Sequence, residues 1–243
     1  MEIITSTDNK TVKRLNKLKQ KKYRDEYGEF FVEGYKNVLD TCAAGAEVRY
    51  VVLSQSAYRA FGEKFADHSV VVLGDGLFDK ITETQNSQGV LCVCAASPSA
   101  FPQNNRVVLL DRVRDPGNVG TILRTAVAFG YDVVLNNCCD VYSPKVVRSA
   151  MSAVVKCRIG RDISPDKLKR SGYELIVADM DGENITSANC ADKYCIVIGN
   201  EADGVSDEIM KLADKKISIP QDNIESLNAA VAAAIMMFEL KAR

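Results

Sequence analysis

The alternation of short apolar strands with helices constrains the fold of this chain more than any other feature of its sequence. From residue 106 onward it predicts helices at about 118–129, 144–153, 205–213 and 224–242, and strands at Val107–Leu110, Val133–Leu135, Lys156–Ile159, Leu175–Ala178, Cys195–Ile198 and Ile217–Ile219. Strands that are apolar on both faces are typical of a parallel sheet that helices cover on both faces. The second half of the chain is therefore expected to form an α/β domain.

The first 95 residues alternate in the same way. The expected elements are, in order, a strand at Glu29–Glu33, a helix at Tyr35–Ala43, a strand at Val48–Ser54, a helix at Ala57–Phe65, a strand at Val70–Leu73, a helix at Gly76–Ile81 and a strand at Gly89–Ala95. This order predicts a small α/β domain with a largely parallel sheet. Pro and Ser punctuate residues 95–105, so we expect domains at 1–96 and 106–243, joined by a linker at 97–105.

Composition excludes several classes of protein. With 47% hydrophobic and 26% charged residues, the chain has ordinary globular values. The longest apolar stretch, Ala229–Phe238, is shorter than the roughly 20 residues of a membrane-spanning helix, and Glu2 disfavours a signal peptide. Eight cysteines without a Cys-x-x-Cys pair indicate free thiols in a reducing cytoplasm and no metal site. The one histidine, His68, is remote from every polar motif, which disfavours an imidazole-dependent triad.

Basic residues cluster near the N-terminus. Between Lys10 and Arg24 there is no acidic residue, and Val12, Leu15 and Leu18 recur every three positions, which predicts one basic amphipathic helix capped by Asp8. Clustered cations favour the phosphates of a nucleic acid. A solvated helix face is the alternative, and a membrane surface is disfavoured because the apolar face lacks Trp and Phe. The candidate phosphate-binding residues are Lys10, Lys13, Arg14, Lys17, Lys21, Lys22 and Arg24.

Three polar segments each follow a predicted strand, where ligands bind in open α/β sheets. In the first, Asp111–Arg124, Gly117 and Gly120 are expected to let the backbone turn tightly before a helix starts. Arg124, one turn after Gly120, is expected to point back toward this loop and to hold a phosphate or a reacting oxygen. An exposed helix arginine is the alternative, although residue 120 offers it no side-chain partner.

The second segment runs from Ile198 to Gly204. Gly199 and Gly204 permit a close approach of a ligand to the backbone, and Glu201 lies near a helix start, where the helix dipole favours a carboxylate. A solvated acidic turn is the alternative.

The third segment, Ile219–Asn228, leads into an Ala-rich helix. Ser226 and Asn228 are expected in the first helical turn, where they bind and orient a ligand without activating it. A purely structural interpretation is also open, because Asp222 and Glu225 have the spacing of a capping box.

Taken together, the strings RDPGNVGTILRTAVAFG, IVIGNEADGVSDEI and ISIPQDNIESLNAAVAAAI resemble, in order and spacing, the three motifs of the SpoU (TrmH-type) RNA ribose methyltransferases of the SPOUT superfamily. KKYRDEYGEFFVEG and ITETQNSQGVLCV resemble the substrate-binding domain that often precedes the catalytic one. The resemblance covers essentially the whole chain. It implies transfer of a methyl group from S-adenosylmethionine to a ribose 2′-hydroxyl of rRNA or tRNA, with rRNA favoured and without a metal.

The resemblance also implies an architecture and partners. The expected fold is a C-terminal α/β trefoil-knot domain preceded by a small, ribosomal-protein-like α/β domain that binds RNA. The expected assembly is a cytoplasmic homodimer with the sites at its interface and no membrane partner. A catalytically silent RNA-binding protein with the same fold is the alternative. A dinucleotide-dependent oxidoreductase is disfavoured because DPGNVG lacks the pyrophosphate-binding fingerprint.

Positions matched to the family's motifs supply the candidate residues. The matched polar residues of the catalytic site are Asn118, Arg124, Glu201, Ser226 and Asn228, and those expected to bind the cofactor are Met180, Ile198, Gly199, Ile219 and Leu227. The resemblance makes Arg124 the group that manages the proton, and three roles stay open: receiving it, stabilising the forming alkoxide, or placing a phosphate as base. The sequence departs from the family pattern in the loop after Ile219, which is one residue short and lacks a glycine, and in reading SLNAA where N-V-S is commoner.

Overall fold

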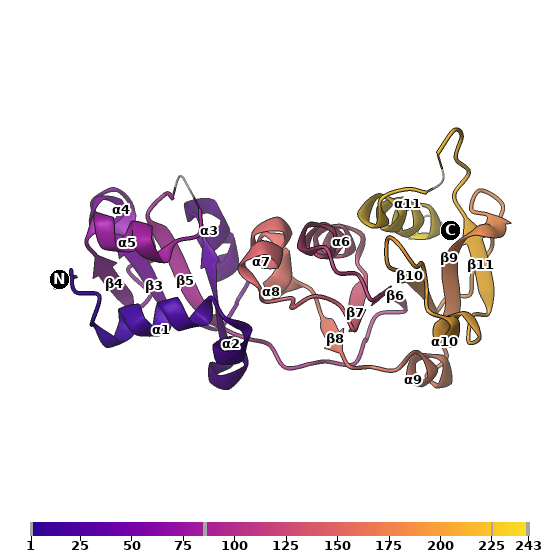
Figure 1. The fold of residues 1–243 in the computed structure, drawn as a ribbon, viewed down its shortest axis with the longest axis horizontal. Helices are drawn as coiled ribbons and strands as arrows, with labels where there is room; N and C mark the ends of the chain where they lie inside the picture. Colours follow the sequence, from indigo (N-terminus) through magenta and orange to yellow (C-terminus); the bar gives the residue numbers. More distant parts are fainter. Residues whose placement is uncertain (1, 85–86, 225, 242–243) are drawn as a thin grey trace. The chain divides into compact units, whose positions relative to one another are not determined.

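The chain folds into two units, drawn in Figure 1 from a computed structural model that describes residues 2–84, 87–224 and 226–241. One unit comprises Met1–Ser97 and Tyr142–Lys156, and the other comprises Pro98–Val141 and Cys157–Arg243. Helices α7 (Pro144–Ala150) and α8 (Ala153–Lys156) therefore belong with the N-terminal elements, and α7 contacts strand β2 (Glu29–Glu33). The domain boundaries expected from the linker composition stay a prediction.

The N-terminal sheet has the order β1-β4-β3-β5-β2. Its other strands are β1 (Ile3–Ile4), β3 (Val48–Ser54), β4 (Val70–Leu73) and β5 (Val90–Ala95). The neighbours β1, β4 and β3 are parallel, but β5 is antiparallel to both β3 and β2. The sheet is thus mixed, and the expectation of a largely parallel one is wrong, because alternation of strand and helix locates strands without fixing the direction of each.

The predicted helix over Lys10–Arg24 is two helices, α1 (Lys10–Leu18) and α2 (Lys21–Tyr27). Gln20 between them has an extended backbone, which ends the first helix. The apolar stripe of α1 is confirmed, because Val12, Leu15 and Leu18 are fully buried. The predicted cap is wrong: the Asn9 side chain accepts from the backbone N–H of Thr11, whereas Asp8 pairs with Lys13.

The remaining N-terminal helices lie where the pattern predicted them. They are α3 (Tyr35–Ala43), α4 (Gln55–Phe61) followed by a 3₁₀ turn η1 (Gly62–Phe65), and α5 (Asp75–Ile81).

The C-terminal sheet has six strands in the order β11-β9-β10-β6-β7-β8, all parallel. They are β6 (Arg106–Asp111), β7 (Asp132–Asn136), β8 (Ile159–Arg161), β9 (Glu174–Asn184), β10 (Tyr194–Ile198) and β11 (Lys215–Ser218). The predicted parallel sheet is confirmed. The strand expected at Lys156–Ile159 starts later, because residues up to Lys156 form α8 and pack in the other unit.

Helices cover both faces of this sheet, as predicted. In Figure 1, α6 (Pro116–Phe129) and α11 (Ala229–Lys241) lie together on one side, and α9 (Pro165–Arg170) and α10 (Asp207–Met210) lie on the other. Helix α11 starts five residues later than expected, and Glu225 of the expected capping box lies outside the described residues. In the described ranges no helix is long and apolar enough to cross a membrane.

Candidate functional site

Side chains from all three polar segments meet in one hydrogen-bonded network at the carboxyl edge of the C-terminal sheet. The amide nitrogen Nδ2 of Asn118 donates to Oε1 of Glu201 at 2.6 Å. The amide nitrogen of Asn228 donates in turn to Oδ1 of Asn118 at 2.9 Å. Asn118 is therefore held at both ends of its amide, and the three segments are brought together as the sequence pattern predicted.

The first segment is fixed by a helix cap. Asp115 has an extended backbone, and its side chain accepts from the backbone N–H of Asn118 at 2.8 Å. Helix α6 begins at Pro116, so Gly117 and Gly120 lie inside the helix and have no left-handed backbone. The tight turn expected from these two glycines is wrong, because proline at the first helical position starts the helix earlier.

The second segment is a closed loop. Asn200 and Gly204 exchange backbone hydrogen bonds of 3.0 and 2.9 Å, and Gly204 adopts the left-handed conformation, with φ at +65°. A side chain at Gly199 would collide with the backbone of Gly204 and Val205. The loop's own packing therefore requires glycine at 199, and a ligand is not needed to explain it.

The third segment supplies the cap of α11. Oδ1 of Asn228 accepts from the backbone N–H groups of Ala230 at 2.9 Å and Val231 at 3.3 Å, so Asn228 precedes the helix. Ser226 also lies before the helix and is exposed. Placing both residues in the first turn is therefore wrong by a few positions, although Asn228 does use the free N–H groups expected there.

Asp111, which is not among the residues predicted from the motifs, links the end of β6 to Asn136 and to Ser206. Its side chain is fully buried at the end of β6 and accepts from the Asn136 amide and from the backbone N–H of Ser206, both at 2.8 Å. The neighbouring Arg112 has a left-handed backbone, with φ at 58°. A carboxylate directly after four apolar residues was the available signal, because buried charges need several hydrogen bonds.

A small cavity lies beside the third segment. Its volume is about 130 Å³, and it is lined by Ala178, Asp179, Met180, Ile217, Ile219, Gln221, Ser226, Leu227 and Ala232. Three of the expected cofactor-binding residues and Ser226 thus surround one space. Ile198 and Gly199 are not part of its lining, and Ile198 is buried at the end of β10.

The lining fits a ligand with both apolar and polar parts. Oε1 of Gln221 is buried without a hydrogen-bond partner among the described residues, so an entering donor would satisfy it. The pKa of Asp179 is lowered by the backbone N–H of Asp181 and then by Lys216, so this carboxylate stays charged at neutral pH. The volume is below the roughly 300–1,000 Å³ of typical small-molecule sites, and it therefore suits one end of S-adenosylmethionine.

Arg124 is not part of the hydrogen-bonded network. It is exposed on α6, and within the described ranges it has no hydrogen-bond or ion-pair partner. Its guanidinium group is therefore available to an incoming ligand. Among the same residues, no group of three or more His, Cys, Asp or Glu side chains is arranged to hold a metal ion.

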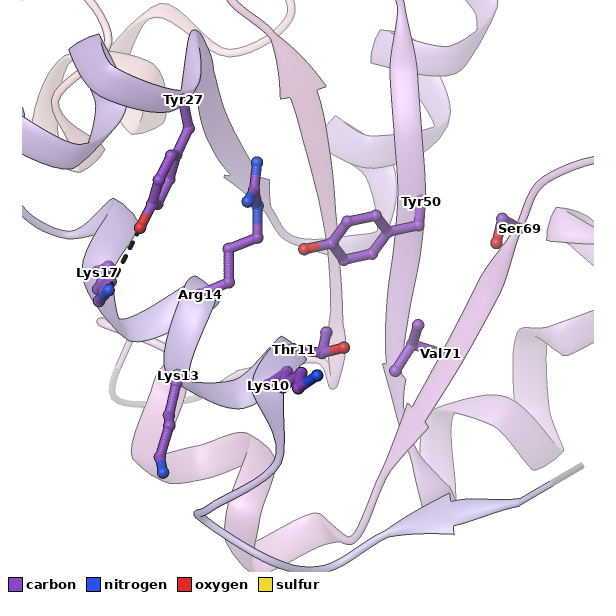
Figure 2. A pocket seen from close by; sticks show the side chains of 9 residues that line it. All are labelled: Lys10, Thr11, Lys13, Arg14, Lys17, Tyr27, Tyr50, Ser69 and Val71. Atoms are coloured by element: carbon purple, nitrogen blue, oxygen red, sulfur yellow. Dashed lines mark hydrogen bonds between the residues drawn. The ribbon is translucent and has the colours of Figure 1, made fainter.

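The seven candidate RNA-binding residues of the N-terminal unit divide into two sets. Lys10, Lys13, Arg14 and Lys17 line one cavity, shown in Figure 2.

The three basic residues of α2 do not line this cavity. Lys21 pairs with Asp25 at 2.5 Å, and Lys22 lies over the Tyr23 ring at 5.6 Å. Arg24 is buried, and its Nη1 donates to the carbonyl oxygens of Leu18 and Lys19 at 2.8 Å each. Arg24 therefore joins α2 to the end of α1, a structural role in place of the expected contact with RNA.

Two parts of the sequence match known families. Residues 105–238 match the SpoU rRNA Methylase family, and residues 9–92 match the MRM3-like substrate binding domain. The chain is 29% identical to the 23S rRNA (guanosine(2553)-2′-O)-methyltransferase RlmP of Bacillus subtilis, over 99% of this chain and 100% of that protein.

Solved structures give the same result. The AdoMet-bound rRNA methyltransferase of Sinorhizobium meliloti superposes with a TM-score of 0.87 at 30% identity, covering 99% of this chain and 97% of that one. The SpoU methyltransferase AviRb of Streptomyces viridochromogenes, in complex with AdoMet, has the same fold, with a TM-score of 0.85 at 24% identity over 96% and 97% of the two chains. The family match spans more than half of the chain. The chain belongs to the SpoU rRNA Methylase family.

Proposed function

We propose that the polar network and the adjoining cavity form the site where a ribose 2′-hydroxyl of rRNA is methylated. The enzyme class follows from the family: the chain is an RNA 2′-O-ribose methyltransferase that uses S-adenosylmethionine. The B. subtilis and S. meliloti relatives are both named as rRNA methyltransferases, which supports rRNA over tRNA as the substrate.

The observation that carries the proposal is the connection between three separate loops. Asn118, Glu201 and Asn228 come from distant parts of the sequence yet share two hydrogen bonds. Ser226 and Leu227, next to Asn228 in the chain, line the cavity. Methyl transfer requires an in-line arrangement of hydroxyl oxygen, methyl carbon and leaving sulfur, so a site for it must hold two ligands in fixed orientation.

The cavity residues are assigned to the cofactor. Met180, Ile219 and Leu227 supply apolar contacts, and Gln221 supplies an unpaired buried acceptor. S-adenosylmethionine, when bound, supplies a methyl carbon already activated on a sulfonium sulfur. Ile198 and Gly199 contribute by shaping the strand end and the closed loop beside the site.

The polar residues are assigned to the ribose. Asn118 and Asn228 orient the hydroxyl or its neighbouring phosphate, and Glu201 fixes the Asn118 amide. Arginine side chains act in proteins as fixed cations, so the role of Arg124 is to stabilise the negative charge that develops on the 2′-oxygen while a neighbouring phosphate of the RNA takes the hydroxyl proton. Ser226 offers one further hydroxyl for positioning.

A homodimer is part of the proposal. Val231 and Phe238 are 46% and 58% exposed on α11, a helix with only Glu239 and Lys241 as charged residues. A helix that is apolar on most sides favours burial against a second surface. The trefoil knot and a cytoplasmic location are further expectations of the resemblance.

The test is transfer of labelled methyl from S-adenosylmethionine to rRNA purified from a strain that lacks this gene. The enzyme is expected to methylate this rRNA at a 2′-hydroxyl. It is expected to transfer no label to rRNA from the parent strain, which already carries the methyl group. Methylation of tRNA instead would overturn the choice of substrate. Binding of rRNA without any transfer would favour the catalytically silent alternative.

A further inference from the structure

A cavity of about 500 Å³ belongs wholly to the N-terminal unit (Figure 2). Its walls come from α1, from Tyr27 at the end of α2, from Tyr50 on β3, and from Ser69 and Val71 at β4. Its lining is Lys10, Thr11, Lys13, Arg14, Lys17, Tyr27, Tyr50, Ser69 and Val71. The cavity is large enough for a small-molecule group, within the roughly 300–1,000 Å³ of typical ligand sites.

The charge of this cavity has one sign. Counted from Lys10, the next cations come three, four and seven residues later, at Lys13, Arg14 and Lys17. This spacing places all four on one face of α1. None of its lining residues is acidic. Four cations gathered on one wall create a positive potential that favours an anion.

The four cations differ in their partners. Arg14 is held by Glu29, with both its Nε and its Nη2 2.9 Å from Oε2, and Lys13 pairs with Asp8 at 2.8 Å. Lys10 and Lys17 have no carboxylate partner among the described residues. These two lysines therefore remain available to neutralise a phosphate.

An aromatic surface adjoins the cations. The Arg14 guanidinium carbon lies 4.2 Å from the centre of the Tyr27 ring, and Nζ of Lys17 donates to the Tyr27 hydroxyl at 3.3 Å. Because Glu29 fixes Arg14, the planar group and the ring form a preorganised layer. Nucleobases stack on tyrosine rings and guanidinium planes.

Tyr50 adds an unsatisfied hydrogen-bonding group. Its hydroxyl oxygen is buried without a hydrogen-bond partner within the described ranges, and Figure 2 shows it pointing from β3 toward α1. Burial, followed by the Glu29 charge, raises the pKa of Tyr50 to about 12, so the phenol stays protonated. A ligand with an acceptor oxygen or nitrogen would give this hydroxyl the partner it lacks.

We infer that this cavity binds one nucleotide of the RNA substrate. Lys10 and Lys17 hold its phosphate, the base stacks on the layer of Arg14 and Tyr27, and the Tyr50 hydroxyl donates a hydrogen bond to it. The inference rests on the proposed function, because the ligand is part of that RNA. It adds a defined subsite to the nonspecific attraction that clustered lysines alone would produce.

The first experiment measures binding of a fluorescent ten-nucleotide single-stranded RNA to the full-length protein. Lys10→Gln is expected to weaken binding about fivefold and to lower the slope of log affinity against log salt by about 0.7, one phosphate contact on a single strand. Lys64→Gln, an exposed lysine on η1 of the same unit, is the matched control. Equal effects of the two substitutions would overturn the inference.

The second experiment tests recognition beyond charge. Tyr50→Phe removes only one oxygen and is expected to weaken binding of the same RNA three- to tenfold, with the salt slope unchanged. Tyr58→Phe, on the exposed side of α4, is expected to bind like the unsubstituted protein. An abasic oligonucleotide that binds as well as the normal RNA, or inorganic phosphate that displaces the RNA at equal phosphate concentration, would contradict a nucleotide subsite.

Methyl transfer separates this inference from the proposed function. The Lys10 and Tyr50 variants are expected to raise KM for rRNA more than they lower kcat, and to bind S-adenosylmethionine normally. Absence of transfer by the unsubstituted enzyme would refute the proposed function, while the binding results would still decide the subsite. Normal transfer with unchanged KM in both variants would refute the subsite alone.

Discussion

The two units of this protein present their functional groups in opposite ways. In the C-terminal unit, Asn118 is bonded at both ends of its amide, beside a cavity of only about 130 Å³. In the N-terminal unit, a cavity of about 500 Å³ keeps two lysines without a carboxylate partner among the described residues. Fixed geometry suits a reaction that needs alignment, and available charge suits capture of a polyanion. Substitutions in the C-terminal unit should therefore change the rate of methyl transfer, and those in the N-terminal unit should change the affinity for RNA.

Arg124 gives the strongest test of this contrast. Arg124→Ala is expected to lower single-turnover methyl transfer about 10²–10³-fold, because an interaction made only in the transition state is lost. Binding of S-adenosylmethionine and of RNA should remain normal, since we assign the cofactor to a cavity that Arg124 does not line and the RNA affinity to the N-terminal unit. Arg124→Lys should rescue poorly, because an ammonium lacks the planar fork of a guanidinium.

The matched control for Arg124 is Arg170→Ala on α9, which removes another exposed arginine of the same unit. If Arg124→Ala and Arg170→Ala transfer methyl groups at similar rates, Arg124 is a surface residue. Arg124 would then no longer support a catalytic role for the C-terminal unit.

Asp111 tests whether the C-terminal geometry is rigid. Asp111→Ala leaves the Ser206 N–H and the Asn136 amide without their buried acceptor, which should lower the free energy of unfolding by about 3 kcal/mol. Urea denaturation at neutral pH measures this loss. Asp203→Ala, an exposed carboxylate in the closed loop, should change stability by less than about 0.5 kcal/mol. Equal losses in the two variants would show that Asp111 does not organise the loops.

The sequence predicted the C-terminal sheet well because buried parallel strands carry a strong apolar signal. All six strands were located, but some of their bounds differ: β8 starts at Ile159 because Ala153–Lys156 forms a helix, β9 continues to Asn184, and β11 starts at Lys215. The N-terminal sheet was harder. The direction of β5 depends on long-range pairing with β3 and β2, which no local pattern contains.

In the candidate site, too, local motifs identified some residues, while the roles of others depend on long-range contacts. Motif resemblance selected Asn118, Glu201 and Asn228, which the structure joins. It did not select Asp111, whose role depends on hydrogen bonds from residues 25 and 95 positions away. It also could not exclude Arg24, because a cationic side chain that bonds carbonyl oxygens of a preceding helix looks the same in sequence as one that faces solvent.

Asn118 sharpens the contrast with a smaller effect. Asn118→Ala breaks the connection between Glu201 and Asn228, and it should lower kcat/KM about tenfold, the value of one orienting hydrogen bond. The Kd for rRNA should stay within twofold, because we assign the RNA affinity to the N-terminal unit. A tenfold loss of rRNA affinity with normal kcat would reverse the assignment of roles to the two units. Thr125→Ala, elsewhere on α6, is the matched control.

The smallest expected effect concerns the alkaline stability that Tyr50 contributes. Burial is the main cause that raises its pKa to about 12 from an ordinary value of 10, with the Glu29 charge adding to the rise and Arg14 opposing it. Between these two values the unfolded chain releases the phenol proton while the folded chain keeps it. Tyr50 therefore contributes stability that is complete below pH 10 and is lost as the pH rises through 12. The unfolding free energy of Tyr50→Phe should decline less steeply over this range than that of Tyr58→Phe, measured by urea denaturation at each pH. Identical declines would mean that the Tyr50 hydroxyl is hydrated, and the N-terminal cavity would lose the neutral donor that distinguishes it from a plain basic surface.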